Sequence, residues 1–349
     1  MKQKVIISEN LERDLVSAIS ECEHDRVFVL TDETTNEKCL PKLSSFLCLK
    51  GAVPIVIRPG DTHKTVDSLC EVWTALSHGG ATRHSLLINL GGGMTTDLGG
   101  FAASTFKRGI DFINIPTTLL AMVDASVGGK TGVNFGGLKN EVGVFSDSRF
   151  VIVSTQFLDT LDSENIRSGY AEMLKHGLIS DESHWAELVG FDLARPDLAH
   201  LQRMVADSIG VKERIVAADP HEHGLRKALN LGHTMGHAFE SFAMRHGRPI
   251  LHGYAVAYGL VCELYMSVRK TAFPTDRMRQ TVRFILDNYG RFQFTCDDYP
   301  ELLELMTHDK KNTSGTINFT LLGGIGDIRI NQTAAKEEIE EAMDFLREG

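Results

Sequence analysis

The sequence lacks the marks of a disulfide-bonded or membrane-spanning protein. It contains no apolar run of about 18 residues, and its start, MKQKVIISENLERDL, has no long apolar core, so we expect neither a membrane span nor a signal peptide. The cysteines show no CxxC pair and no metal-ligand spacing; they are Cys22, Cys39, Cys48, Cys70, Cys262 and Cys296. We therefore expect reduced thiols in a cytoplasmic protein.

Positive charge is also scarce. The chain has 36 lysines and arginines against 46 acidic residues, and its net charge of −10 argues against nucleic acid as a partner. The overall composition is ordinary for a soluble globular protein, because 42% of the 349 residues are hydrophobic and 23% are charged. This length is sufficient for two domains.

The first half of the chain alternates short β-rich runs with helical patterns. The strand candidates are KVIIS, RVFVLTD, VPIVIRPGD, SLLINLGGG and FINIPTT, and helical segments near 9–22, 34–49, 64–79 and 94–105 separate them. This alternation predicts a parallel sheet covered on both faces, whose ligands bind at the carboxyl ends of the strands. The residues expected at those ends are Asp32, Gly60, Asp61, Gly91 to Gly93, Thr117 and Thr118.

The second half has a different pattern. From 163 to 308 apolar residues recur at three- and four-residue spacing, which predicts helices. A short β-like pair, TINFTLL and GDIRINQ, precedes a closing helix at 333–347. We therefore predict an α/β domain of the nucleotide-binding type over 1–155 and a mostly helical domain over 156–349.

The segment from Arg226 to Gly253, RKALNLGHTMGHAFESFAMRHGRPILHG, is rich in histidine. His233 and His237 lie four residues apart and so share one helical face, and His252 follows a turn onto a second helix. Three such imidazoles can form a metal site with one open position, although the pair alone could simply be a polar helix face.

Three features refine this hypothesis. Glu172, three residues before Lys175 in SGYAEMLKHG, offers the carboxylate that commonly joins two histidines around zinc. HTMGH lacks the general-base glutamate of HExxH because position 234 is threonine, which disfavours a peptidase. The glycines at 232, 236 and 253 leave room for close helix approach.

Two glycine-rich turns and several cations indicate an anionic ligand. SLLINLGGGMTTD runs from a strand into a helix start, where backbone N–H groups can bind a pyrophosphate, or where a tight turn alone is needed. VGGKT at 127–131 is not a Walker A motif, since Asp124 occupies the required upstream glycine position. Solvated surface charges are the alternative for any single cation, but together they suit a substrate with more than one negative charge; they are Lys130, Lys175, Lys212 and Arg226.

Several longer motifs carry a family resemblance. GGGMTTDLGGFAASTFKRG, PTTLLAMVDASVGGKTGVNFGGLKN, SGYAEMLKHG, GLRKALNLGHTMGHAFE, LHGYAVAYG and HDKKN together resemble the dehydroquinate synthase family of sugar-phosphate cyclases, from about residue 30 to 325. The resemblance implies a Rossmann-like α/β domain that binds NAD, an all-helical C-terminal domain that binds Zn²⁺ or Co²⁺, and a homodimer.

The resemblance also implies a lyase reaction of the shikimate pathway, which leads to the aromatic amino acids. In it, 3-deoxy-D-arabino-heptulosonate 7-phosphate gives 3-dehydroquinate and phosphate through transient oxidation by NAD, phosphate elimination, reduction and an intramolecular aldol closure. The alternatives are another sugar-phosphate cyclase, a metal-dependent alcohol or glycerol dehydrogenase, or a protein that keeps the fold without catalysis. The uncharged substrates of the dehydrogenases need fewer cations.

Site residues follow from the resemblance, motif by motif. It makes Glu172, His233 and His252 the metal ligands, and it turns His237 toward the substrate instead. The NAD contacts are Asp32, Asp61, Lys64, Gly92, Gly93, Asp97, Thr117, Thr118, Lys130 and Lys139. The substrate contacts are Asp124, Lys130, Asn140, Lys175, Lys212, Arg226, Asn230, His237 and, within HDKKN, Lys310 or Lys311, with Lys310 preferred; Arg108 reaches in from the partner subunit.

The chain departs from the family pattern in two places. Asp61 stands where glutamate is usual, which affects an adenosine contact. The segment TLDSEN at 160–165 lacks the usual proline and arginine, which affects the connection between the domains rather than a proposed ligand.

Overall fold

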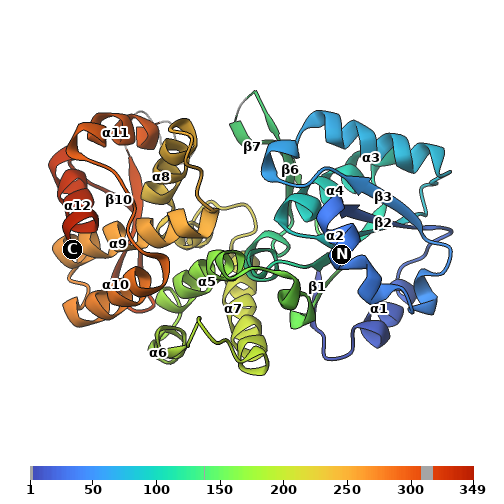
Figure 1. The fold of residues 1–349 in the computed structure, drawn as a ribbon, viewed down its shortest axis with the longest axis horizontal. Helices are drawn as coiled ribbons and strands as arrows, with labels where there is room; N and C mark the ends of the chain where they lie inside the picture. Colours follow the sequence, from blue (N-terminus) through green and yellow to red (C-terminus); the bar gives the residue numbers. More distant parts are fainter. Residues whose placement is uncertain (1–2, 137, 308–316) are drawn as a thin grey trace. The chain divides into compact units, whose positions relative to one another are not determined.

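The computed structural model describes residues 3–136, 138–307 and 317–349, and it divides into two compact units, Met1–Asp162 and Ser163–Gly349 (Figure 1). The boundary expected from the sequence, at 155/156, falls at the turn η6 (Thr155–Thr160), which belongs to the first unit. Lys310 and Lys311 lie outside the described residues. Within the described ranges, no helix is both long and apolar enough to cross a membrane.

A six-stranded parallel sheet forms the centre of the first unit (Figure 1). The five predicted strands are present, as β1 (Lys4–Ile7), β2 (Val27–Asp32), β3 (Val53–Ile57), β4 (Leu86–Gly91) and β5 (Asp111–Pro116). A sixth, β8 (Phe150–Val153), was not predicted. The order β1-β8-β5-β4-β2-β3 reverses between β2 and β4, and the crevice at such a reversal is where sheets of this kind bind ligands.

Helices cover both faces of this sheet. Right-handed crossovers place α1 (Leu11–Ser20) and α2 (Glu33–Lys38) on one face, and α3 (Val66–His78) and α4 (Gly93–Thr105) on the other. A hairpin of β6 (Lys130–Phe135) and β7 (Leu138–Phe145), also not predicted, packs against α4.

The predicted helix over 34–49 is wrong beyond Lys38. The chain instead forms two short turns, η1 (Leu40–Leu43) and η2 (Leu47–Leu49). Pro41 at the start of η1 explains the break, because proline lacks the N–H that a continuing α-helix requires.

Eight helices and one hairpin make up the described part of the second unit. They are α5 (Ser163–Leu178), α6 (Glu182–Gly190), α7 (Leu198–Ala218), α8 (His233–Arg245), α9 (His252–Thr271), α10 (Thr275–Tyr289), α11 (Tyr299–Thr307), β9 (Asn318–Gly324), β10 (Asp327–Thr333) and α12 (Lys336–Glu348). The fold class is confirmed, with the qualification that β9 and β10 form the one β element, which TINFTLL and GDIRINQ predicted. Helix α9 is central: it contacts α5, α8, α10 and α12, as its almost wholly apolar sequence requires.

Candidate metal and dinucleotide sites

Glycines bring three helices of the second unit into close contact. A Cβ on Gly259 would lie 1.9 Å from the Gly232 carbonyl oxygen, so α9 and α8 touch through their backbones. A Cβ on Gly253 would lie 1.8 Å from the Ser168 carbonyl oxygen, and the Gly253 N–H donates to Ser168 Oγ at 3.1 Å. The close approach expected from the glycines is confirmed, and it places the first turn of α9 against α5.

This packing gathers Glu172 of α5, His233 of α8 and His252 of α9. Glu172 Oε1 lies 3.4 Å from His233 Nε2 and 3.7 Å from His252 Nε2. Oε1 is buried and accepts no hydrogen bond from the described residues. Donor atoms about 2.0–2.2 Å from a tetrahedral metal lie roughly 3.3–3.6 Å apart, so the distances from Glu172 Oε1 to the two Nε2 atoms are close to those of a metal site.

The other nitrogen of each imidazole is oriented by a second partner. His233 Nδ1 donates to the Leu231 carbonyl oxygen at 3.1 Å, and His252 Nδ1 donates to Glu240 Oε2 at 3.1 Å. Such contacts direct the two Nε2 lone pairs toward a metal. The sequence reasoning missed Glu240, although its position seven residues after His233 on the same helical face could have indicated it.

The ionisation states of Glu172 and His252 depend on each other and on their charged neighbours. Burial opposes ionisation of Glu172, but the adjacent Lys175 ammonium and His252 outweigh it and hold the pKa of the carboxyl well below its usual range. Lys175 pairs with Oε2, the opposite oxygen from the one that faces the imidazoles. Burial lowers the pKa of His252, yet Glu172 and Glu240 outweigh it and raise that pKa to about 10. A divalent cation that binds here would therefore displace a proton from His252.

A second combination of ligands is also within reach. Donor atoms of His233, His237 and His252 lie within 4.8 Å of one another, which is the three-histidine set that the spacing alone suggested. This set carries no negative charge, whereas Glu172 contributes a fully buried carboxylate. Zn²⁺ or Co²⁺ bound by two imidazoles and the Glu172 carboxylate would neutralise this buried charge. A site of three neutral imidazoles would leave the carboxylate facing two of the rings without a metal bond, so it fits less well.

Three further predicted substrate residues, Lys212, Arg226 and Asn230, belong to the second unit. Lys212 on α7 and Arg226 in the turn η7 (Leu225–Asn230) are both buried. Arg226 Nη1 donates to the Pro220 carbonyl oxygen at 2.6 Å, and Asn230 Nδ2 donates to Glu222 Oε1 at 3.0 Å.

Asp219 closes the loop that precedes Arg226. It accepts hydrogen bonds from the backbone N–H groups of Gly224, His223 and Arg226, and these lower its pKa to about 2. The loop around Arg226 is therefore held by backbone hydrogen bonds to one carboxylate.

The first unit gathers its predicted residues at the sheet reversal between β2 and β4. Asp32 ends β2 and accepts from Thr95 Oγ1 of α4 at 3.2 Å. Gly92, at the start of α4, has no side-chain cap, and a Cβ there would lie 3.1 Å from Thr118 Cγ2. Backbone N–H groups at an uncapped, glycine-lined helix start are suited to a pyrophosphate.

Hydrogen bonds and ion pairs link the neighbouring predicted residues. Lys64 is buried and donates to Asp97 Oδ2 and Asn140 Oδ1, while Lys139 lies 3.2 Å from Asp61 Oδ2. These contacts join the loop after β3 to α4 and to the β6–β7 hairpin. Asp61, the departure from the family pattern, is thus within reach of a cation in its own unit.

Other predicted residues of the first unit are more dispersed. Asp124 lies in the turn η5 (Ala121–Ala125), and Lys130 is the exposed first residue of β6. Arg108 is exposed in the turn η4 (Phe106–Arg108) and lines a cavity of about 640 Å³ with Arg83, Asp111 and Arg149. Because Arg83 and Arg149 precede β4 and β8 and Asp111 is the first residue of β5, the cavity lies at the amino ends of the strands, at the opposite edge of the sheet from Gly92.

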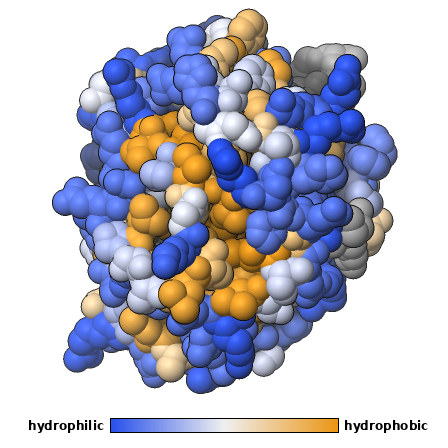
Figure 2. Space-filling model, turned by 90° about the vertical axis from the view of Figure 1, so that its right-hand side faces the viewer, coloured by the Kyte–Doolittle hydropathy of each residue, from blue (hydrophilic) through white to orange (hydrophobic). Residues whose placement is uncertain are grey.

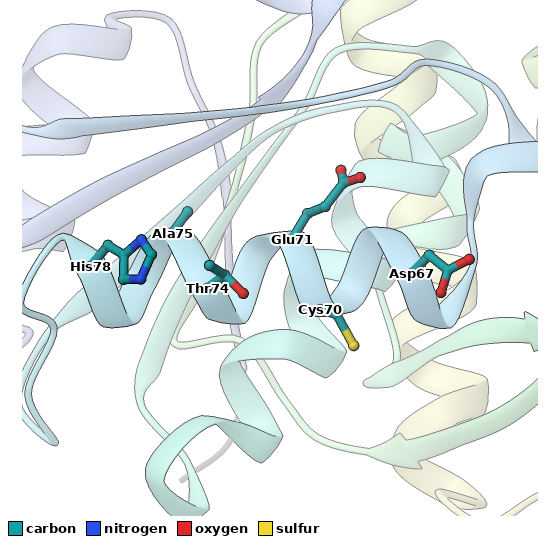
Figure 3. Close-up of a pocket in the computed structure, with 6 residues that line it drawn as sticks. All are labelled: Asp67, Cys70, Glu71, Thr74, Ala75 and His78. Atoms are coloured by element: carbon teal, nitrogen blue, oxygen red, sulfur yellow. The ribbon is translucent and has the colours of Figure 1, made fainter.

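A second hollow, of about 520 Å³, holds no predicted site residue. Figure 3 shows that all its lining side chains come from the single helix α3, including Asp67, Glu71 and His78. Since one exposed helix face provides no converging groups, this hollow is not a candidate active site.

Two solved structures of synthases share this two-unit fold. A 2-epi-5-epi-valiolone synthase from Streptomyces hygroscopicus subsp. jinggangensis, with NAD⁺ and Zn²⁺ bound, is 25% identical, with a TM-score of 0.86 over 100% of this chain and 97% of that one. A 2-deoxy-scyllo-inosose synthase, complexed with carbaglucose-6-phosphate, NAD⁺ and Co²⁺, is 22% identical and shares the fold, with a TM-score of 0.85 over 99% and 96% of the two chains.

The particular family follows from the sequence comparisons. Residues 54–168 match the family model described as 3-dehydroquinate synthase N-terminal, and residues 169–312 match the one described as 3-dehydroquinate synthase C-terminal. A 3-dehydroquinate synthase of Parabacteroides distasonis is 53% identical over 347 residues, which cover 99% of this chain and 98% of the relative. The chain therefore belongs to the 3-dehydroquinate synthase family.

Proposed function

We propose that the chain catalyses the 3-dehydroquinate synthase reaction, the conversion of 3-deoxy-D-arabino-heptulosonate 7-phosphate to 3-dehydroquinate and phosphate. The observation that carries this assignment is the 53% identity to a 3-dehydroquinate synthase over nearly the whole of both chains. The enzyme is a carbon–oxygen lyase that depends on NAD and a divalent metal. Its cofactors are NAD and Zn²⁺ or Co²⁺, as in the structural neighbours.

The metal is assigned to Glu172, His233 and His252. When bound, it polarises a substrate hydroxyl and favours its oxidation by NAD. Lys175 neutralises the outer oxygen of Glu172, while Leu231 and Glu240 hold the two rings. His237 lies on the same face of α8, with its ring centroid 5.3 Å from that of His233, and is assigned to the substrate and its phosphate.

NAD is assigned to the carboxyl ends of the strands in the first unit. Gly92 and Gly93 present backbone N–H groups to the pyrophosphate, and Asp32 at the end of β2 suits a ribose hydroxyl. The remaining contacts come from the loops after β3 and β5, from α4 and from the β6–β7 region: Asp61, Lys64, Asp97, Thr117, Thr118, Lys130 and Lys139.

The remaining polar residues bind and orient the substrate. Cations neutralise the carboxylate and the phosphate, and amide and acid groups hold the hydroxyls: Asp124, Lys130, Asn140, Lys175, Lys212, Arg226, Asn230, His237 and Lys310. The departing phosphate can take the proton itself, so the main contribution of the protein is orientation and charge neutralisation.

We further propose a cytoplasmic homodimer in which Arg108 completes the partner's site. Two observations support it. Arg108 lies at the edge of its own sheet opposite the NAD-binding strand ends, so a role in its own dinucleotide site is disfavoured. Figure 2, which faces the first unit, shows a band of apolar residues, and exposed apolar side chains of this unit include Leu47 and Val56. Large exposed apolar patches commonly mark protein interfaces.

A phosphate-release assay tests the reaction. With the heptulosonate phosphate, NAD and Zn²⁺, phosphate should accumulate while absorbance at the NADH wavelength stays flat, because NAD is reduced and reoxidised in each turnover. Stoichiometric NADH from a simple polyol would favour a dehydrogenase. Phosphate release from another sugar phosphate, but not from the heptulosonate, would indicate a different cyclase.

A further inference from the structure

Helix α8 begins without a cap of its own. Its N-cap residue is Gly232, in the left-handed region at φ +79°, and it offers no side chain to the first N–H groups. Glycine is required there, because a Cβ would lie 2.9 Å from the Leu260 side chain and 3.0 Å from the Val256 carbonyl oxygen. The close packing of α8 on α9 thus leaves buried donors beside His233 that must be satisfied from elsewhere.

Glu263 of α9 satisfies these donors. Its side chain is fully buried, and Oε2 accepts from the Gly232 N–H at 2.6 Å. Oε1 accepts from the N–H groups of Thr234 at 3.1 Å and Met235 at 3.3 Å. One carboxylate therefore brackets the peptide of His233, and it does for α8 what an N-cap side chain would ordinarily do.

We propose that Glu263 is a positioning residue for the metal site: its buried carboxylate caps α8 from α9 and thereby fixes the backbone that presents His233. The Leu231 carbonyl oxygen, which orients the His233 ring, belongs to the same turn. A negative charge at a helix N-terminus also stabilises that helix. Glu263 touches neither substrate nor cofactor in this role; it acts through His233.

Sequence alone hints at such a role. In HGYAVAYGLVCELYMSV, the mostly apolar part of α9 that precedes Arg269 and Lys270, Glu263 is the only acidic or basic residue apart from His252. A buried carboxylate needs several hydrogen-bond donors to remain in such a helix. Its donors are the first turn of the neighbouring helix, so the residue links the two helices that carry His233 and His252.

Metal affinity tests the proposal in the intact chain. Glu263→Gln removes the charge and turns an amide N–H₂ toward backbone donors. It should weaken Zn²⁺ binding about 10-fold or more, measured by competition with a chelator, and alter the visible absorption of the Co²⁺ form. The matched control is Asp181→Asn, which perturbs the N-cap of α6, a helix with no proposed ligand. Asp181→Asn should leave Zn²⁺ affinity and the Co²⁺ spectrum unchanged. The NAD affinity of Glu263→Gln should also be unchanged.

Hydrogen exchange of the wild type provides a second test that needs no variant. The amides of Gly232, Thr234 and Met235 should be protected in the metal-free protein, because the carboxylate holds this turn before metal binds. Wild-type affinity and an unchanged Co²⁺ spectrum in Glu263→Gln would overturn the proposal, whatever its thermal stability. Free exchange of these amides until metal is added would do the same, and it decides the question if the variant does not fold.

The inference rests on the metal site proposed above. The two hypotheses fail differently. A wild-type protein that binds no divalent metal refutes the site itself and the role of Glu263 with it. A wild type that binds metal, with a Glu263→Gln variant that binds it equally well, refutes only the positioning role.

Discussion

The two units build their binding residues in different ways. In the first, Asp32, Gly92 and Thr117 lie at or just beyond the carboxyl ends of adjacent strands, so the sheet itself aligns them. In the second, Glu172, His233 and His252 come from three separate helices and meet only because glycines allow backbone contact. One site depends on strand order, the other on close packing around buried charge.

This difference predicts different sensitivities to substitution. A site at strand ends relies largely on backbone N–H groups, and a single side-chain change removes only part of it. A cradle of buried ionised groups depends on every member, because removing one leaves the others uncompensated. Substitutions of the NAD contacts in the first unit should therefore affect NAD binding in graded steps, and substitutions of the three metal ligands in the second should each remove most of the metal affinity.

The largest effect is expected at the metal ligands. Glu172→Gln, His233→Ala and His252→Ala should each weaken metal binding by more than roughly 100-fold, beyond the usual effect of an outer-sphere partner. His237→Ala should keep its metal and lose turnover. Metal content per chain, measured after chelation and reloading with Zn²⁺, checks this. A metal-free His237→Ala beside a fully loaded Glu172→Gln would select the three-histidine site instead.

Variants of Arg108 test whether a residue of one chain acts in its own site or in the site of the partner subunit. Arg108→Ala and Arg108→Lys should fold, bind NAD and metal, and lose roughly 100-fold in activity, because the planar fork of arginine can pair two phosphate oxygens. Mixing Arg108→Ala with Lys130→Ala should restore about a quarter of wild-type activity if subunits exchange at random, since half the dimers then hold one intact site of two. Proven exchange without recovery would place Arg108 outside the partner's site.

An intermediate effect is expected at Lys64. Lys64→Met keeps the length of the side chain but removes its hydrogen bonds to Asp97 and Asn140, so NAD should bind about 10-fold more weakly, or about 1.4 kcal/mol, by calorimetry. Lys42→Met is the control, because Lys42 pairs with Asp159 at the surface of the same unit. Metal content should not change in either variant; metal loss in Lys64→Met would contradict the independence of the two sites.

The smallest effect concerns Asp219 and pH. Its folded pKa of about 2 lies below the ordinary value of 3.8, so the ionised carboxylate stabilises the fold above pH 3.8, and this contribution is lost as pH falls through 2. The difference in urea midpoint between wild type and Asp219→Asn should thus shrink on acidification over that range. A difference that does not vary with pH would show that the backbone hydrogen bonds to Asp219 do not depend on its charge.

Local patterns determined much of this protein. Strand–helix alternation predicted five of the six strands of the parallel sheet, and three- and four-residue spacing predicted the helical second unit. The motifs were sufficient by themselves to identify the family, because each combines residues whose roles depend on short-range spacing. Pro41 shows where a local rule was overlooked, since it ends the helix predicted over 34–49.

The tertiary structure decided which distant residues meet. The β6–β7 hairpin was missed because Gly132 and Gly143 interrupt its pattern, and β8 because it is only four residues long and pairs with β1, which is distant in sequence. Spacing alone favoured His237 beside His233, whereas packing turned Glu172 Oε1 toward His233 and His252. Sequence position can single out Glu240 and Glu263 as unusual carboxylates, but their roles depend on the donors around them, and sequence separation does not reveal those donors.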